Sequence, residues 1–154
     1  MADQRGDAGS LTYDPDADAA QRYPDWVIRT ADLGGIIPEV LSTARRVILI
    51  EERQSPAVRR SSLAHAIAHL DLGHHRTLAG WFENREEADA DELAARRLIP
   101  LESLAHTLAW SRERFEVAAE LDVDLIMLEV RENTLTRAER RRLRELLRRS
   151  QAVA

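Results

Sequence analysis

Two histidines four residues apart form half of a metal site. His65 and His69 lie in the segment SLAHAIAHLDLGHH (62–75). Side chains four apart on a helix are neighbours one turn from each other, so both imidazoles can reach one zinc ion at roughly 2.0–2.1 Å. The pair alone does not establish a metal site, because a solvated helix face can carry two histidines without any ligand.

Two carboxylates in a later helical segment strengthen the metal hypothesis. Glu87 and Asp91 stand four apart in EADADELAARRLIP (87–100), in line with an apolar, core-facing row. A buried carboxylate without a partner is expensive, and complementing the helix dipole accounts for Glu87 but not for an inward Asp91. A metal accounts for both, with Glu87 as the third ligand and Asp91 as the acceptor that orients a ligand histidine. Two histidines and one glutamate leave a fourth position open, as in catalytic zinc sites.

Ala66 occupies the position where a hydrolytic zinc helix, H-E-x-x-H, carries its glutamate. That glutamate is the general base, which takes a proton from water and passes it to the leaving amine. Alanine can do neither, and no acid within the motif is spaced to replace it, since Asp71 falls on another side of the helix. His74 and His75 are candidates for binding the transition-state oxyanion, for auxiliary metal ligation, or for a plain loop.

The two segments together resemble the ImmA/IrrE family of zinc metallopeptidases, a gluzincin-like group, over residues 26–100 and more loosely to about 149. The resemblance implies a small α+β peptidase fold with zinc as its cofactor. It implies His65, His69 and Glu87 as ligands and Asp91 as the carboxylate behind them. It further implies a bacterial or phage-borne cytoplasmic protein that acts on a helix-turn-helix repressor, and so relieves repression of stress or mobile-element genes.

Ala66 departs from the family pattern, and the departure has two interpretations. One is a natural pseudo-protease that binds its partner without cutting it. The other is a deliberate substitution that inactivates the enzyme, to stop self-damage or to trap a substrate. Proteins that lost activity long ago have more often lost metal ligands as well. The complete ligand set therefore favours the second interpretation. Under either, we expect the chain as written to bind zinc and to lack useful turnover.

The elements that must position this site are a small sheet and two helices. The β-branched segments WVIRT (26–30), IIPEVLST (36–43) and RRVILIEE (45–52) predict a three-stranded antiparallel sheet, with Pro38 placing the middle segment at an edge or bulge. A helix is predicted from Pro56 to a stop at Gly73.

The apolar face of the first helix and the bounds of a second helix can also be predicted. The apolar stripe Leu63, Ile67 and Leu70 lies opposite the histidines on the first helix. A second helix is predicted from Asn84, its cap, to Leu98. The fold class is therefore α+β, with the sheet packed on the zinc-site helix and a mainly helical C-terminal half.

The chain divides into an acidic, flexible arm (1–22), a metallopeptidase core (23–100) and a helical region (101–154) packed on the core. Helices are predicted in the last region near 101–110, 112–121, 124–133 and 137–149, the last one opened by a Thr136–Glu139 capping box.

The segment 114–133 has the shape of a helix-turn-helix, which makes a DNA-binding regulator the second hypothesis. Its second helix carries three acids beside one arginine, and that surface repels phosphate, which argues against direct DNA contact. The third hypothesis is a helical interaction protein without metal.

Composition limits the remaining choices. The 154 residues include 44% apolar and 32% charged side chains, as in an ordinary globular domain. There is no cysteine, hence no thiolate metal site or disulfide, and no apolar run of about 18 residues that would cross a membrane. The start of the chain lacks the apolar core of a secretory signal, so we expect a cytoplasmic protein whose partner is a protein substrate. Its oligomeric state does not follow from the sequence.

Overall fold

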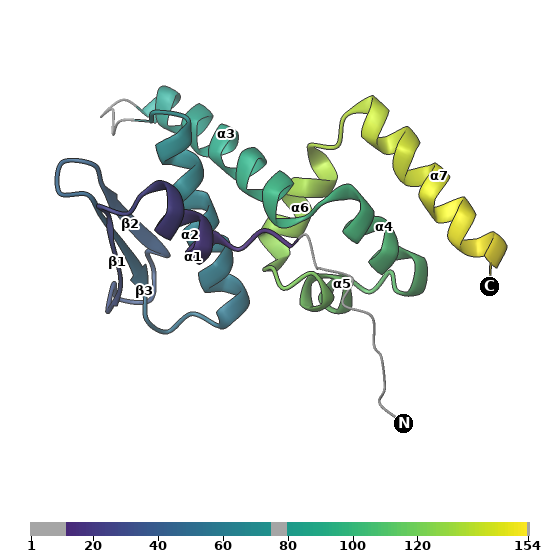
Figure 1. Cartoon of the computed structure of the whole chain (residues 1–154), viewed down its shortest axis with the longest axis horizontal. Helices are drawn as coiled ribbons and strands as arrows, with labels where there is room; N and C mark the ends of the chain where they lie inside the picture. Colours follow the sequence, from purple (N-terminus) through teal and green to yellow (C-terminus); the bar gives the residue numbers. More distant parts are fainter. Residues whose placement is uncertain (1–11, 75–79, 154) are drawn as a thin grey trace.

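The computed structural model describes residues 12–74 and 80–153 and has an α+β fold. In Figure 1 the sheet lies at one end, α2 and α3 in the middle, and the C-terminal helices at the other end. The elements are α1 (Pro15–Arg22), β1 (Val27–Ala31), β2 (Glu39–Ser42), β3 (Val47–Glu51), α2 (Pro56–Asp71), α3 (Gly80–Leu98), α4 (Leu101–Trp110), α5 (Arg114–Glu120), α6 (Leu125–Asn133) and α7 (Arg137–Val153).

The sheet is mixed, so the prediction of an all-antiparallel sheet is wrong for one strand pair. The order is β1-β3-β2, with β3 antiparallel to β2 but parallel to β1. The connection from β1 to β2 passes the end of β3, where the Glu51 carboxylate accepts the N–H groups of Leu33 and Gly35 at 2.8 and 2.9 Å. The central strand is thus the apolar β3, Val47–Glu51. Pro38 precedes the edge strand β2, as predicted.

Helix α2 is packed between two apolar clusters. Its start follows the predicted chemistry, with the Ser55 side chain capping it and Pro56 in the first turn, and Gly73 follows its end with φ +66°. Leu63 and Ile67 are fully buried against the sheet. Ala64 and Ala68, in contrast, belong to the cluster shared with the later helices. The middle of α2 is consequently enclosed on several sides.

Helix α3 begins at Gly80, one turn before the predicted cap, so Asn84 is an exposed residue within the helix and not its first cap. The sequence between Gly80 and Asn84 contains no helix breaker, and the helix therefore extends towards its N-terminus. It ends at Leu98, two residues before Pro100, as predicted.

The C-terminal helices are joined to α3 through one buried arginine. Arg131 on α6 is 2% exposed; its Nε donates to the Ile99 carbonyl at 2.9 Å and its Nη2 to Glu139 at 2.8 Å. The predicted capping box of α7 is confirmed, because the Thr136 and Glu139 side chains each accept the other residue's backbone N–H.

Among the described residues, no helix combines the length and apolar character needed to cross a bilayer.

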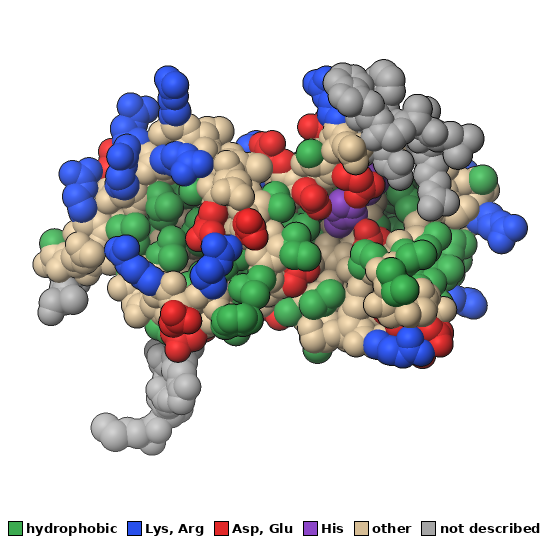
Figure 2. All heavy atoms as spheres, turned by 180° about the vertical axis from the view of Figure 1, so that it is seen from behind, with side chains coloured by type: hydrophobic (Ala, Val, Ile, Leu, Met, Phe, Trp, Pro, Cys, Tyr) green, Lys and Arg blue, Asp and Glu red, His purple; other side chains and the backbone are tan. Residues whose placement is uncertain are grey.

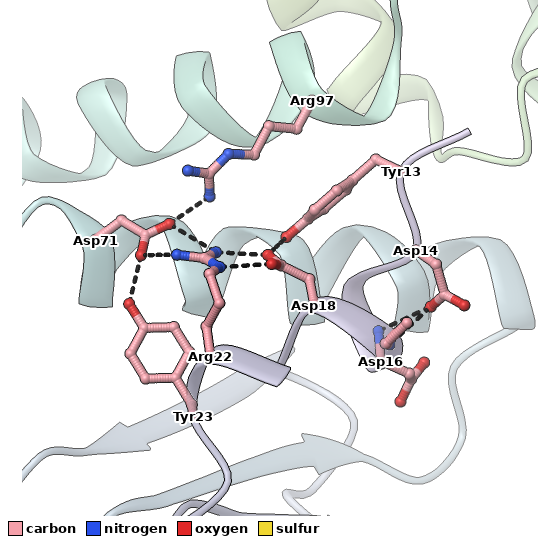
Figure 3. Close-up of polar contacts among 9 residues, drawn as sticks. Tyr13, Asp14, Asp16, Asp18, Arg22, Tyr23, Asp71 and Arg97 are labelled. Atoms are coloured by element: carbon pink, nitrogen blue, oxygen red, sulfur yellow. Dashed lines mark hydrogen bonds and ion pairs between the residues drawn. The ribbon is translucent and has the colours of Figure 1, made fainter. Parts of the chain in front are cut away.

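The Asp71 carboxylate at the end of α2 fastens three helices together (Figure 3). It accepts hydrogen bonds from Arg22 of α1, from Arg97 of α3 and from the Tyr23 hydroxyl. Arg22 also pairs with Asp18 one turn back on α1. The part of the predicted acidic arm that the structure describes is therefore packed on the core, and residues 1–11 lie outside the described residues.

We expect Asp71→Asn to lower the free energy of unfolding by about 2–3 kcal/mol, because it removes the negative charge and one of the two oxygens that accept from two arginines and a tyrosine. Burial opposes ionisation of Asp71, but the hydrogen bonds from Arg22, Tyr23 and Arg97 outweigh it and lower its pKa. The stability difference should thus be complete above about pH 4 and close as the pH falls through the lowered pKa.

Urea unfolding curves between acidic and neutral pH measure this difference. Asp25→Asn is the control, because Asp25 pairs with Arg46 while 79% exposed, and surface pairs contribute less than about 1 kcal/mol. Equal losses in the two variants would contradict the role given to Asp71.

Candidate metal centre

The three predicted ligands come from two helices that small side chains hold close together. His65 and His69 project from α2 and Glu87 from α3. Ala64 and Ala68 of α2 and two alanines of α3, Ala90 and Ala94, are fully buried in one cluster. Because alanine adds little beyond the backbone, the helices approach closely enough for side chains beside the contact to meet.

The donor atoms of these ligands converge on one point. The Nε2 atoms of His65 and His69 are 2.9 Å apart, and the Glu87 carboxylate lies 3.2 Å from the first and 3.3 Å from the second. Tetrahedral zinc with bonds of 2.0–2.1 Å has ligand atoms about 3.3–3.4 Å apart. The residues therefore fit a metal ion, and no other group of described residues forms a comparable cluster.

Both histidine rings are held by their second nitrogen. His65 Nδ1 lies 2.9 Å from the Asp91 carboxylate, and His69 Nδ1 lies 2.9 Å from His74 Nδ1. A proton on each Nδ1 leaves the Nε2 lone pairs free for the metal. Asp91 thus contacts the ring nitrogen of His65 that does not face Glu87. His74 lies behind His69, away from the point of convergence, and His75 is outside the described residues.

Electrostatics at the site favour a positive charge. Burial disfavours charged His65, but hydrogen bonds to Asp91 and Glu87 and the charge of Glu39 outweigh it and raise its pKa to about 10. Burial and the neighbouring His65 charge lower the pKa of His69. The hydrogen bond from His65 lowers the pKa of Glu87. In the metal-free protein, a proton on His65 thus takes the place of a cation.

Access to the centre is from the Glu87 side. The side chains of His65 and His69 are 10% and 13% exposed, whereas Glu87 is 53% exposed. Figure 2 shows histidine and acidic side chains next to each other on the molecular surface, on the face turned away in Figure 1. A ligand can therefore reach the metal position without unfolding the helices.

Ala66 leaves helix α2 without an acid at the metal. It is 1% exposed and belongs to the apolar cluster on the sheet side. Asp71 is turned away and engaged by Arg22 and Arg97, as its place on the helix predicted.

One acidic residue at the site was missed by sequence reasoning. Glu39 of β2 brings its Oε1 to 3.7 Å from His65 Nε2. Burial raises the pKa of Glu39, against the opposing effects of His65 and of a hydrogen bond with Ser62. Strand alternation in EVLS (39–42) places Glu39 and Leu41 on one face, and that signal could have revealed it.

The helix-turn-helix-like segment forms α5 and α6, but its geometry does not suit DNA. Arg131, the only basic residue of α6, is buried against Ile99 and Glu139. Asp124 caps the helix by accepting the Met127 N–H at 2.7 Å. The end of α6 that would meet a phosphate backbone therefore presents an acid and no exposed cation.

An α+β fold in which a histidine pair on one helix and a glutamate on the next could hold one metal ion is an arrangement typical of metallopeptidases. The model of peptidase family M78, described as the IrrE N-terminal-like domain, matches residues 21–133. The chain belongs to this family, which confirms the resemblance seen in the sequence. No curated protein and no solved structure matches the chain.

We expect zinc binding at about pH 8 to release about one proton from the site. His65 is protonated in the metal-free protein at this pH, whereas His69 is already neutral and Glu87 already ionised. Zinc needs the Nε2 lone pair of His65 and so displaces its proton. The release should disappear as the pH rises through 10.

Titration calorimetry in buffers of different ionisation enthalpy counts the released protons. Asp91→Asn removes an acceptor that holds the His65 proton, so this variant should release fewer. Heats that do not depend on the buffer would show that His65 is neutral before zinc arrives.

Proposed function

We propose that this protein is a zinc-dependent peptidase of ImmA/IrrE type that acts on a protein substrate, a helix-turn-helix transcriptional repressor, and thereby relieves repression. The observation that carries the proposal is the convergence of His65, His69 and Glu87 within 2.9–3.3 Å of one another. Nitrogen and carboxylate donors in this number are the ligand set of hydrolytic zinc.

The division of labour among the residues follows from their positions. His65, His69 and Glu87 hold the metal, while Asp91 and His74 keep the two rings oriented. When bound, zinc supplies a Lewis acid that polarises a peptide carbonyl and makes water a better nucleophile at neutral pH.

The substrate is held beside this centre by the edge strand β2. This strand has one neighbour, β3, in the described sheet. An extended peptide can add to its free side by backbone hydrogen bonds. Ile36 and Ile37, which are 90% and 50% exposed just before β2, offer apolar contacts to the peptide.

We expect zinc binding to be lost in His69→Ala and in Glu87→Ala, because each removes one of three ligands. Asp91→Asn should weaken binding about 10–100-fold, since it only loosens the orientation of His65. Competition with a chromogenic chelator measures the dissociation constants. His106→Ala, an exposed histidine of α4, is the matched control. Parent-like affinity in both ligand variants would refute the site.

We expect Ala66→Glu to cleave the substrate faster than the parent, because it restores a proton acceptor to α2; the gain is roughly 10²–10⁴-fold if no other carboxylate at the site accepts the proton. The assay is co-expression with a candidate helix-turn-helix repressor from the same genome, followed by mass spectrometry of the fragments. A chelator should abolish the cleavage. Ala66→Gln is the matched control, because the amide has the same size and cannot accept the proton.

The competing interpretation is a natural pseudo-protease. This interpretation holds if the parent and Ala66→Glu both bind zinc, both bind the repressor, and neither cleaves it. If cleavage continues with chelator present, a contaminating protease is responsible and the metal has no part in it.

A further inference from the structure

The strand β2 directs an acidic side chain into the metal centre from outside the peptidase motif. Glu39 lies opposite Ile50 in the antiparallel pairing of β2 with β3. Directly opposed residues in such a pair project from the same face of the sheet. Ile50 is fully buried and shares an apolar cluster with Ala66. Glu39 therefore lies on the sheet face that covers α2, on the same side as position 66.

The polar contacts of Glu39 agree with this placement. Its Oε1 is 3.7 Å from His65 Nε2, and the nearby Ser62 side chain acts to lower the pKa of Glu39. Ser62 precedes Ala66 by one helical turn, and His65 directly precedes it. A carboxylate that lies near both residues is next to the space that a longer side chain at position 66 would fill.

Glu39 lacks the partners that the other inward carboxylates have. Its side chain is 14% exposed, and among the described residues it has no arginine within ion-pair distance. Asp71 has two arginines, and Glu51 accepts three backbone N–H groups. An apolar residue opposite Ile50 would suit the fold better, because burial of a poorly paired carboxylate is unfavourable. The position is thus better explained by chemistry than by folding.

We propose that Glu39 is a further catalytic residue, which supplies from the edge strand the proton-accepting carboxylate that Ala66 no longer supplies from the helix. The proposal rests on the proposed peptidase function. In this proposal Glu39 lies beside the metal and is not one of its ligands. The donor atoms of His65, His69 and Glu87 lie within 4.8 Å of one another, and Glu39 does not belong to this group.

The proton transfer balances without any additional reactant. As the oxygen of water attacks the scissile carbonyl carbon and the C–O bond forms, one water proton moves to Glu39 Oε1. When the C–N bond breaks, Glu39 returns that proton to the leaving nitrogen. The products are a carboxylic acid and an amine, and Glu39 is ionised again.

The test compares four proteins that contain zinc: the parent, Glu39→Gln, Ala66→Glu, and the double variant Glu39→Gln/Ala66→Glu. We expect chelator-sensitive cleavage of the co-expressed repressor by the parent. Glu39→Gln should cleave at least about tenfold more slowly, because the amide cannot accept the proton. The double variant should regain activity, because the acid is back on the helix. Glu52→Gln, an exposed acid just after β3, is the matched control.

A second measurement separates proton transfer from a structural or ligand role. The zinc dissociation constant of Glu39→Gln should stay within about threefold of the parent's, far from the roughly 10–100-fold effect of disturbing a ligand's orientation. A larger loss would make Glu39 a ligand or a support of the site and would overturn the proposal.

The outcomes also distinguish this proposal from the function on which it rests. If Ala66→Glu cleaves and the parent does not, the peptidase function stands and the role of Glu39 is overturned. If the parent and Glu39→Gln cleave at equal rates, the role of Glu39 is again overturned. If no variant cleaves although all bind zinc and the repressor, both fail.

Discussion

The close approach of α2 and α3 is the constraint on which the metal centre depends. Alanines line the contact on both helices, among them Ala64, Ala68, Ala90 and Ala94, all fully buried. Contacts between small residues bring helix axes to about 8 Å, the short end of the usual range. A close approach of this kind lets two imidazoles on one helix and a carboxylate on the other lie 3.2–3.3 Å apart. The network around Asp71 then holds α1 against the same pair of helices.

Charge balance explains why the site between α2 and α3 favours a bound cation. The carboxylates of Glu39, Glu87 and Asp91 all lie near the His65 ring. One proton on the two histidines leaves an excess of negative charge in a partly buried space, where screening by water is weak. A divalent ion compensates more of that charge than a proton does. The same surplus of acids that raises the pKa of His65 in the metal-free protein therefore favours metal binding.

Much of the fold and of the site could be predicted from local sequence patterns. The features that these patterns missed depend on pairing between distant segments of the chain. Ser55, Pro56 and Gly73 delimit α2 because caps and turns act on their own neighbours. Helical spacing likewise indicated the three side chains that converge, His65, His69 and Glu87. The order β1-β3-β2 brings Glu51 against a loop 16–18 residues earlier in the chain, and local sequence patterns do not show such a contact. Strand alternation puts Glu39 on the same face as Leu41, but the pairing with β3 was needed to show that this face covers α2.

The position of Glu39 changes what the missing glutamate of the motif signifies. Proton transfer requires a carboxylate within reach of the reacting atoms, and the backbone from which it comes is immaterial. Ala66 is 1% exposed in the apolar cluster that joins α2 to the sheet, so alanine suits the packing there. An acid delivered by the edge strand leaves that cluster intact and lies on the strand proposed to hold the peptide. The substrate and the proton acceptor then share one element, so a peptide bound in register on β2 is also aligned with the carboxylate that serves it.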